Sequence, residues 1–414
     1  KKSELLKQRL LKYLKDHPDS YRGMSSSRHA VGLALLTAGP QYENTGKSIV
    51  SSWNGVPGPE TWSWNLAYQL ITLAEYHLQT GDKSVLPTML ELSKMLRRAQ
   101  YKGKIQKWKA MGEHSQEKID IHQALYEGGF AHGPYKPWMG GYGPMQFPTI
   151  LAVIGWQLAA ECGVVMEEQE EAIKAAFRFI ERGTADDGHV AYGGEFTLNN
   201  GPIDWVRWKK GRSDNYGGRV GCALVAHKMS PEMPKSEELV KLSASYIDHA
   251  YKSMPNGHAC AVLGFSWGLL GTAMSHDPVL IRKVFDYYKA WFNMARCHDG
   301  SFVVLPGRDY ADGSYYRSSR YHLTGVMGLI FGLNNPKLRI QGVRVSIPGV
   351  NHKRAILAFQ KAGFEVTHKK GKHVVMSNGR QTIVLPRQNP INAVTMGVIV
   401  KGSGLTVEEF KALL

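Results

Sequence analysis

The sequence of 414 residues lacks any long, uninterrupted apolar run, although 43% of its residues are hydrophobic. The longest candidate, 259–274, contains glycine and serine and is too short to cross a bilayer, so we expect no membrane span. Charged residues make up 21% of the chain, and this balance is typical of a folded, water-soluble protein. The length allows two or three domains with sizeable cores.

Cysteine is scarce, and the four cysteines are scattered singly: Cys162, Cys222, Cys260 and Cys297. Without a CxxC or a close Cys/His cluster, a structural zinc site has no support, and we expect no metal and no cofactor. Unclustered thiols favour a reducing compartment, hence the cytoplasm. The sequence starts at Lys1 without methionine or an apolar leader, which indicates a processed product, so export stays open.

Acidic residues are outnumbered by basic ones, 35 against 51, which gives a net charge of +16. The segment 341–414 holds 11 Lys and Arg against three Glu, whereas the first 340 residues hold 40 against 32 acids. Less than a quarter of the chain therefore carries half of the excess positive charge. Such a dense field favours a polyanionic partner, and a merely solubilising surface is the alternative.

Tryptophan and tyrosine are absent after residue 340, where phenylalanine is the remaining aromatic residue. The composition changes just after the turn signal Asn334-Asn335-Pro336. We therefore predict two domains, residues 1–340 and 341–414.

Before residue 340, two kinds of helical pattern alternate. One set is apolar nearly all round and predicts buried helices: 27–37, 62–78, 146–162, 215–228, 258–274 and 320–333. The other has one charged face and predicts outer helices: 2–16, 83–99, 167–182, 236–252 and 279–296, with 43–53 as a shortened sixth member. The fold class that follows is mainly α, an (α/α)6 toroid of six inner and about six outer helices, followed by a small α+β domain.

Two links after outer helices share a signature, "DDGHVAYGG" after Arg182 and "HDGSFVVLP" after Arg296. Asp-Gly makes a sharp turn that sends the next residues back onto the ring. These links resemble those of the alpha/alpha toroids of terpenoid cyclases and protein prenyltransferases, and the likeness extends to uncharacterised bacterial toroid proteins. The cyclase DxDD motif and the prenyltransferase zinc set are absent from the sequence, so neither activity is expected.

The tail predicts a helix, three strands and one or two helices. Asn351 can cap the first helix and Gly363 can end it. Asn378-Gly379 is a strong hairpin signal between the second and third strands. Thr406 and Glu409 form a capping box for the last helix. The order is α-β-β-β-α.

The tail also resembles the HicA family of toxin ribonucleases, which have a fold like that of double-stranded-RNA-binding domains. It keeps Lys-x-Gly-Phe at 361–364, "KKGKH", "IVLPR", Gly397, Ile399 and "EEF". The resemblance places the catalytic histidine at His373. The sequence departs from the family pattern at Lys372, where a serine is expected, and at Gln388, where a histidine is expected.

A metal-free ribonuclease needs a proton carrier and cations that stabilise charge on the phosphate. His373 has the suitable ordinary pKa. Lys369, Lys370, Lys372 and Arg380 would supply the cations. The same side chains would bind RNA or another polyanion without cleaving it, and a solvated basic turn is the third interpretation.

The toroid predicts a funnel for a small-molecule or glycan ligand where the inner helices begin. The residues that we expect there are Trp62, Trp64, Asn65, His132, Tyr142, Gln146, Asp214, Tyr216, His258, Arg317, Arg320, Tyr321 and His322. A lyase on an anionic glycan would use Arg or Asn to neutralise a uronate carboxylate, and Tyr and His to move protons. A non-catalytic binding scaffold is the alternative. A glycoside hydrolase stays open through Glu127 with Asp214.

Overall fold

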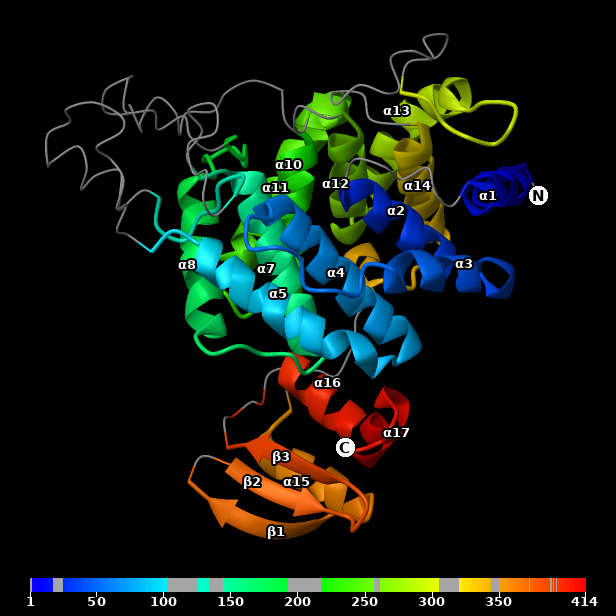
Figure 1. The fold of residues 1–414 in the computed structure, drawn as a ribbon. Helices are drawn as coiled ribbons and strands as arrows, with labels where there is room; N and C mark the ends of the chain where they lie inside the picture. The colour runs from blue at the N-terminus through cyan, green and yellow to red at the C-terminus, as the bar shows by residue number, and fades with distance from the viewer. Residues whose placement is uncertain are drawn as a thin grey trace, which may run out of the picture. The chain divides into compact units, whose positions relative to one another are not determined.

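The structure, a computed structural model, describes residues 2–17, 25–102, 126–133, 144–192, 217–256, 261–304, 320–343, 350–371, 373–387, 389, 391 and 393–414. It divides into two compact units, one of residues 1–159 and 165–342 and the other of residues 160–164 and 343–414. The described chain is mainly helical, with a small three-stranded sheet near its C-terminus (Figure 1).

Six helices of the first unit are buried nearly all round, as their apolar composition predicts. They are α2 (Ser25–Leu36), α4 (Ser63–Thr80), α7 (Gln146–Glu161), α10 (Gly217–Met229), α12 (Ala261–Met274) and α14 (Arg320–Phe331). Each lies where the sequence predicts a buried helix, so this part of the prediction is confirmed.

Six further helices bury one face. They are α1 (Lys2–Asp16), α3 (Pro40–Ser51), α5 (Leu86–Ala99), α8 (Gln169–Arg182), α11 (Ser236–Ala250) and α13 (Pro278–Ala295). Short 3-10 turns are η1 (Lys83–Val85), η5 (Tyr251–Asn256), η7 (Gly332–Asn334) and η8 (Arg339–Gln341). The Asp277 carboxylate caps α13 by accepting hydrogen bonds from the Val279 and Leu280 amides, and Pro278 fits its first turn.

The buried helices contact one another in a closed succession. Helix α2 packs against α4 and α14, and α12 packs against α10 and α14. Gly155 of α7 lies against Leu70 of α4. The Gln157 amide of α7 donates a hydrogen bond of 2.7 Å to the hydroxyl of Ser230, the residue after α10. The succession α2, α4, α7, α10, α12, α14 therefore returns to α2.

Neighbours in this succession run parallel. Between α2 and α4, Ser25 contacts Asn65 near both beginnings, and His29 contacts Thr72 farther along. Three other helix pairs show the same order of contacts. For α4 with α7 they are Trp64 with Phe147 and Leu70 with Gly155. For α2 with α14 they are Val31 with Gly325 and Ala34 with Gly328, and for α10 with α12 they are Gly218 with Gly268 and Gly221 with Gly271. The beginnings of the buried helices consequently lie at one end of the unit.

Three links that follow outer helices repeat one local structure. Each has a glycine with positive φ beside an isolated antiparallel bridge: Gly128 before Phe130–Met145, Gly188 within Thr184–Val190, and Gly300 within Arg296–Phe302. A β-carbon on any of these glycines would collide with a backbone carbonyl of another outer helix, α8, α11 or α1 respectively. Glycine is therefore required for both the conformation and the close approach.

The second unit contains α15 (His352–Lys361), β1 (Glu365–Lys370), β2 (His373–Ser377), β3 (Thr382–Pro386), α16 (Ala393–Gly402) and α17 (Val407–Leu413). The strands form an antiparallel sheet in the order β1-β2-β3. The Asn351 cap and the capping box of Thr406 with Glu409 are both present. The predicted order of helix, three strands and closing helices is confirmed.

Alternate residues of β2 and β3 form the core of this unit. Val374, Met376, Ile383 and Leu385 are buried together with Phe359 of α15. The intervening residues point to the other face of the sheet, because side chains alternate along a strand. His373 lies on that face and is exposed.

Candidate functional site

Aromatic rings cluster at the beginning of α4, and the cluster includes His132, one of the predicted funnel residues. The Trp64 indole nitrogen donates a hydrogen bond of 3.0 Å to Nδ1 of His132. The ring centroids of Trp62 and His132 are 5.3 Å apart, and Trp64 also packs against Phe147 at the start of α7. The Trp62 side chain is 40% exposed, so this cluster presents an aromatic face to solvent.

His132 is held in one orientation. Its backbone carbonyl accepts a hydrogen bond of 2.8 Å from the amide of Ser63, the first residue of α4. Because Nδ1 accepts from Trp64, the neutral ring carries its proton on Nε2. Burial lowers the pKa of His132 below its ordinary value, which favours the neutral imidazole at neutral pH.

Tyr192 occupies the equivalent place at the beginning of α7. Its backbone carbonyl accepts a hydrogen bond of 3.1 Å from the amide of Gln146, the first residue of that helix. Tyr192 follows the turn glycine Gly188 by four residues, just as His132 follows Gly128. The repeated links thus place a histidine and a tyrosine at the beginnings of two neighbouring buried helices.

Arg219 places a positive charge beside Tyr192. Its Nε donates a hydrogen bond of 3.0 Å to the Val190 carbonyl, and its guanidinium lies 5.3 Å from the centroid of the Tyr192 ring. Arg219 belongs to the first turn of α10 and is 1% exposed. A cation in such an apolar setting strengthens local electrostatic interactions because the surrounding dielectric is low.

Among the described residues, several buried polar atoms near the beginnings of α2, α4 and α7 have no hydrogen-bond partner. They are Ser26 Oγ, Ser27 Oγ, His29 Nε2, Ser63 Oγ and Gln146 Oε1. Unpaired buried polar atoms cost stability, and native proteins contain few of them. These five atoms at one end of three neighbouring helices are available to a polar ligand.

His29 lies deeper between the buried helices. The Thr72 hydroxyl donates to the Tyr68 carbonyl at 2.6 Å, so it accepts its 2.9 Å hydrogen bond from Nδ1–H of His29. Burial, with a smaller contribution from the nearby His322, lowers the pKa of His29 to about 3. Burial likewise lowers the pKa of His322 to about 3. Both imidazoles are therefore neutral near pH 7.

The remaining predicted funnel residues are distributed as follows. Asn65 accepts a hydrogen bond from the Ser25 hydroxyl and is exposed. The Gln146 amide donates to the Phe179 carbonyl of α8. The Tyr321 hydroxyl reaches the Leu14 carbonyl of α1, and Arg320 pairs at 3.7 Å with Asp299 in the preceding link, so these two side chains contact outer elements. Tyr142, Asp214, Tyr216, His258 and Arg317 lie outside the described residues.

The predicted tail site is described in part. His373 opens β2 and pairs in register with Lys370 of β1 and Pro386 of β3. Arg380 is exposed in the hairpin between β2 and β3. Lys372 and the side chains of Lys369 and Lys370 lie outside the described residues, so the predicted lysine cluster stays a prediction.

Metal ligands and membrane spans were also sought among the described residues. Within these ranges, no three His, Cys, Asp or Glu side chains gather in a way that could hold a metal ion. None of the described helices is long and apolar enough to cross a membrane. Cys222 and Cys297 are free thiols, and Cys260 lies outside the described residues.

Comparison with known families covers most of the first unit. Residues 3–342 match the family model described as a domain of unknown function, DUF6288. The chain belongs to the DUF6288 family. The match ends at the boundary between the two units and does not include the tail, so the HicA resemblance stays a prediction.

Two further comparisons complete this picture. No curated protein sequence matches this DUF6288 chain. Among solved structures, it is similar to a polysaccharide lyase, with a TM-score of 0.48 and 11% sequence identity. That match covers 80% of this chain and 96% of the lyase chain.

Proposed function

We propose that the first unit is an (α/α)6 toroid and a lyase that cleaves an acidic glycan where the buried helices begin. One observation carries the proposal: His132 and Tyr192 occupy equivalent positions at neighbouring helix beginnings, and His132 lies beside the exposed indole of Trp62. An elimination requires a group that transfers protons, which a tyrosine can do, and a hydrogen-bond donor that holds the carboxylate, which an imidazole N–H can supply.

Trp62 would bind the sugar ring. An indole offers an apolar face together with a polar N–H, which suits a ligand with C–H groups on one side and hydroxyls on the other. Asn65 lies three residues farther along the chain and is exposed. Because its carboxamide oxygen accepts from Ser25, its amide N–H groups are directed to other acceptors, such as sugar hydroxyls or a carboxylate.

The acidic group of the glycan is favoured by the helices themselves. The parallel helices present their partially positive ends on one side of the unit, and such ends attract anions. The buried Arg219 adds a full positive charge beside Tyr192. The net charge of +16 attracts polyanionic substrates at longer range. These contributions all favour a uronate over a neutral sugar.

The reaction that fits these groups is β-elimination. A base removes the proton on the carbon next to the uronate carboxylate, the bond from the neighbouring carbon to the glycosidic oxygen breaks, and an acid protonates the leaving oxygen. A carbon–carbon double bond remains in the product. We assign both proton transfers to Tyr192, whose phenolate takes the proton from carbon and whose resulting phenol returns it to the leaving oxygen. Orientation of the carboxylate is assigned to the Nε2–H of His132. Arg219 would stabilise the charge that develops on the carboxylate.

The test is to incubate the full chain with hyaluronan, chondroitin, alginate and polygalacturonate and to follow the ultraviolet absorbance of the new double bond. We expect one substrate to react, and Tyr192→Phe to lower its rate at least a hundredfold because the phenolic proton is lost. Tyr287→Phe is the matched control, since Tyr287 is exposed on α13. If all four substrates stay unreacted, or if Tyr192→Phe retains full activity, the assignment is wrong.

The second unit supports a separate role as a polyanion-binding domain. His373 is exposed at the start of the central strand and pairs in register with Lys370 of β1, which favours contact with a phosphate backbone. RNA binding is the proposed activity, and cleavage by His373 is the stronger version of it. Titration of labelled RNA against the full chain and its Arg380→Ala variant at two salt concentrations tests the binding. A titration without saturation at low salt would contradict it.

A further inference from the structure

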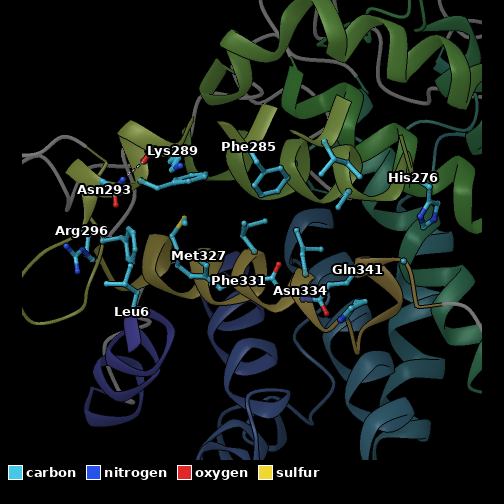
Figure 2. Close-up of a pocket in the computed structure, with 18 residues that line it drawn as sticks. Leu6, His276, Phe285, Lys289, Asn293, Arg296, Met327, Phe331, Asn334 and Gln341 are labelled. Carbon is cyan, nitrogen blue, oxygen red and sulfur yellow. Dashed lines mark hydrogen bonds between the residues drawn. The ribbon is translucent and has the colours of Figure 1, made fainter. Parts of the chain in front are cut away.

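An elongated cavity of about 630 Å³ opens on the outer side of the first unit, away from the beginnings of the buried helices. Helix α13 forms one wall, α14 and the segment 332–342 form the other, and Leu6 of α1 contributes at one end (Figure 2). Its volume lies within the range of roughly 300–1,000 Å³ that is typical of small-molecule sites.

The walls of the cavity are apolar over most of its length. Ile281, Phe285 and Phe292 of α13 line the cavity. Met327 and Phe331 of α14 lie across it from Phe285 (Figure 2). The three α13 side chains are only partly buried, although their spacing is that of a core-facing helix stripe. The helix thus directs apolar side chains into a space that the protein itself leaves open.

The lysine and the arginine of the cavity lie together at one end. Lys289, Asn293 and Arg296 follow one another at helical spacing, far from His276 at the opposite end (Figure 2). The described lining contains no carboxylate. Neither Lys289 nor Arg296 pairs with a carboxylate anywhere in the described residues. One end of an apolar channel therefore offers two uncompensated positive charges.

We propose that this cavity binds a free long-chain fatty acid, with its carboxylate between Lys289 and Arg296 and its aliphatic chain along Phe285. The charge complementarity selects an anionic head group, since the lining holds cations without acids. The apolar walls and the elongated shape select an unbranched chain. The proposal is independent of the glycan site, because no residue is shared between them.

The experiment is calorimetric titration of the full chain with hexanoate, octanoate, decanoate and dodecanoate below their micelle concentrations. Each added methylene is expected to raise the affinity about fourfold, since burying one contributes about 0.8 kcal/mol. Lys289→Ala combined with Arg296→Ala should weaken dodecanoate binding roughly three- to twentyfold while the fourfold increment per methylene is retained. Lys283→Ala is the control, because Lys283 is exposed on the same helix and pairs with Asp248 outside the cavity.

Three outcomes would overturn the proposal. The first is an absence of saturable dodecanoate binding. The second is equal affinity for dodecyltrimethylammonium, which would show that the two cations select nothing. The third is a stable dimer in sedimentation that dodecanoate does not dissociate and Phe285→Gln disrupts, which would assign the apolar walls to a second copy of the chain. Because Phe285 is partly exposed, that variant is expected to fold.

Discussion

Three buried histidines predict that the first unit loses stability when the pH falls from 7 to 5. Burial lowers the pKa of His29 and His322 to about 3 and that of His227 to about 4. In the unfolded chain each imidazole regains its ordinary pKa of about 6.5. Between these values the unfolded state binds more protons than the folded state, so stability is present above pH 6.5 and is lost as the pH falls.

The loss in free energy of unfolding at pH 5 is set mainly by the pKa of the imidazoles in the unfolded chain. A pH that lies about 1.5 units below the unfolded pKa costs about 2 kcal/mol for each imidazole that stays neutral when folded. All three folded pKa values lie below 5, so the folded imidazoles stay neutral at this pH. The three histidines together lower the free energy of unfolding by about 6 kcal/mol, a large part of the stability of an ordinary domain.

His227→Asn isolates one of these contributions. His227 contacts the Ser236 hydroxyl through Nδ1, and an asparagine amide retains a polar group at that place without titrating. The assay is urea unfolding followed by tryptophan fluorescence, which reports on the first unit because all ten tryptophans precede residue 341. We expect the variant to lose about 2 kcal/mol less than the parent chain between pH 7 and pH 5. An unchanged pH dependence would refute the reasoning.

Three further predictions test packing, capping and ligand binding. Gly271→Ala should destabilise the first unit by roughly 1–3 kcal/mol in urea unfolding, because its β-carbon would collide with Gly221 of α10, whereas Gly58→Ala meets open space and should change little. Thr406→Ala removes the capping box of α17 and should raise amide exchange in that helix by an amount equivalent to about 1 kcal/mol. Trp62→Ala should weaken glycan binding by about tenfold without changing unfolding, and a loss of stability instead would assign Trp62 to packing.

The helices were predictable from the sequence because the burial of a helix determines which of its positions are apolar. A helix that is buried all round must be apolar all round, so α12, with Phe265 and Trp267 among small residues, is evident without coordinates. The caps at Asn351 and Thr406 were predictable for a similar reason, since side chain and turn are adjacent in sequence. Signals of this kind depend on neighbouring residues in the sequence, so they can be recognised without knowledge of the fold.

Tyr192 was missed because its role depends on a backbone contact. The carbonyl that caps Gln146 comes from a residue 46 positions later, and no local pattern reveals that pairing. A usable signal did exist, since His132 and Tyr192 each follow a turn glycine by four residues. This signal was not recognised because the first of these turns has the sequence Glu127-Gly128 in place of Asp-Gly.

The outer cavity could not be predicted from the sequence, because it depends on the separation of α13 from α14 in space.

The central claim is that the first unit cleaves an acidic glycan by elimination, and the masses of the products test it most directly. Elimination divides the chain without adding water, so the product masses sum to that of the substrate, and the fragment bearing the new double bond is one water lighter than its hydrolysed counterpart. The account predicts this deficit with the full chain and its absence with Tyr192→Phe. Fragments that each carry the mass expected from hydrolysis, or an intact substrate throughout, would contradict it.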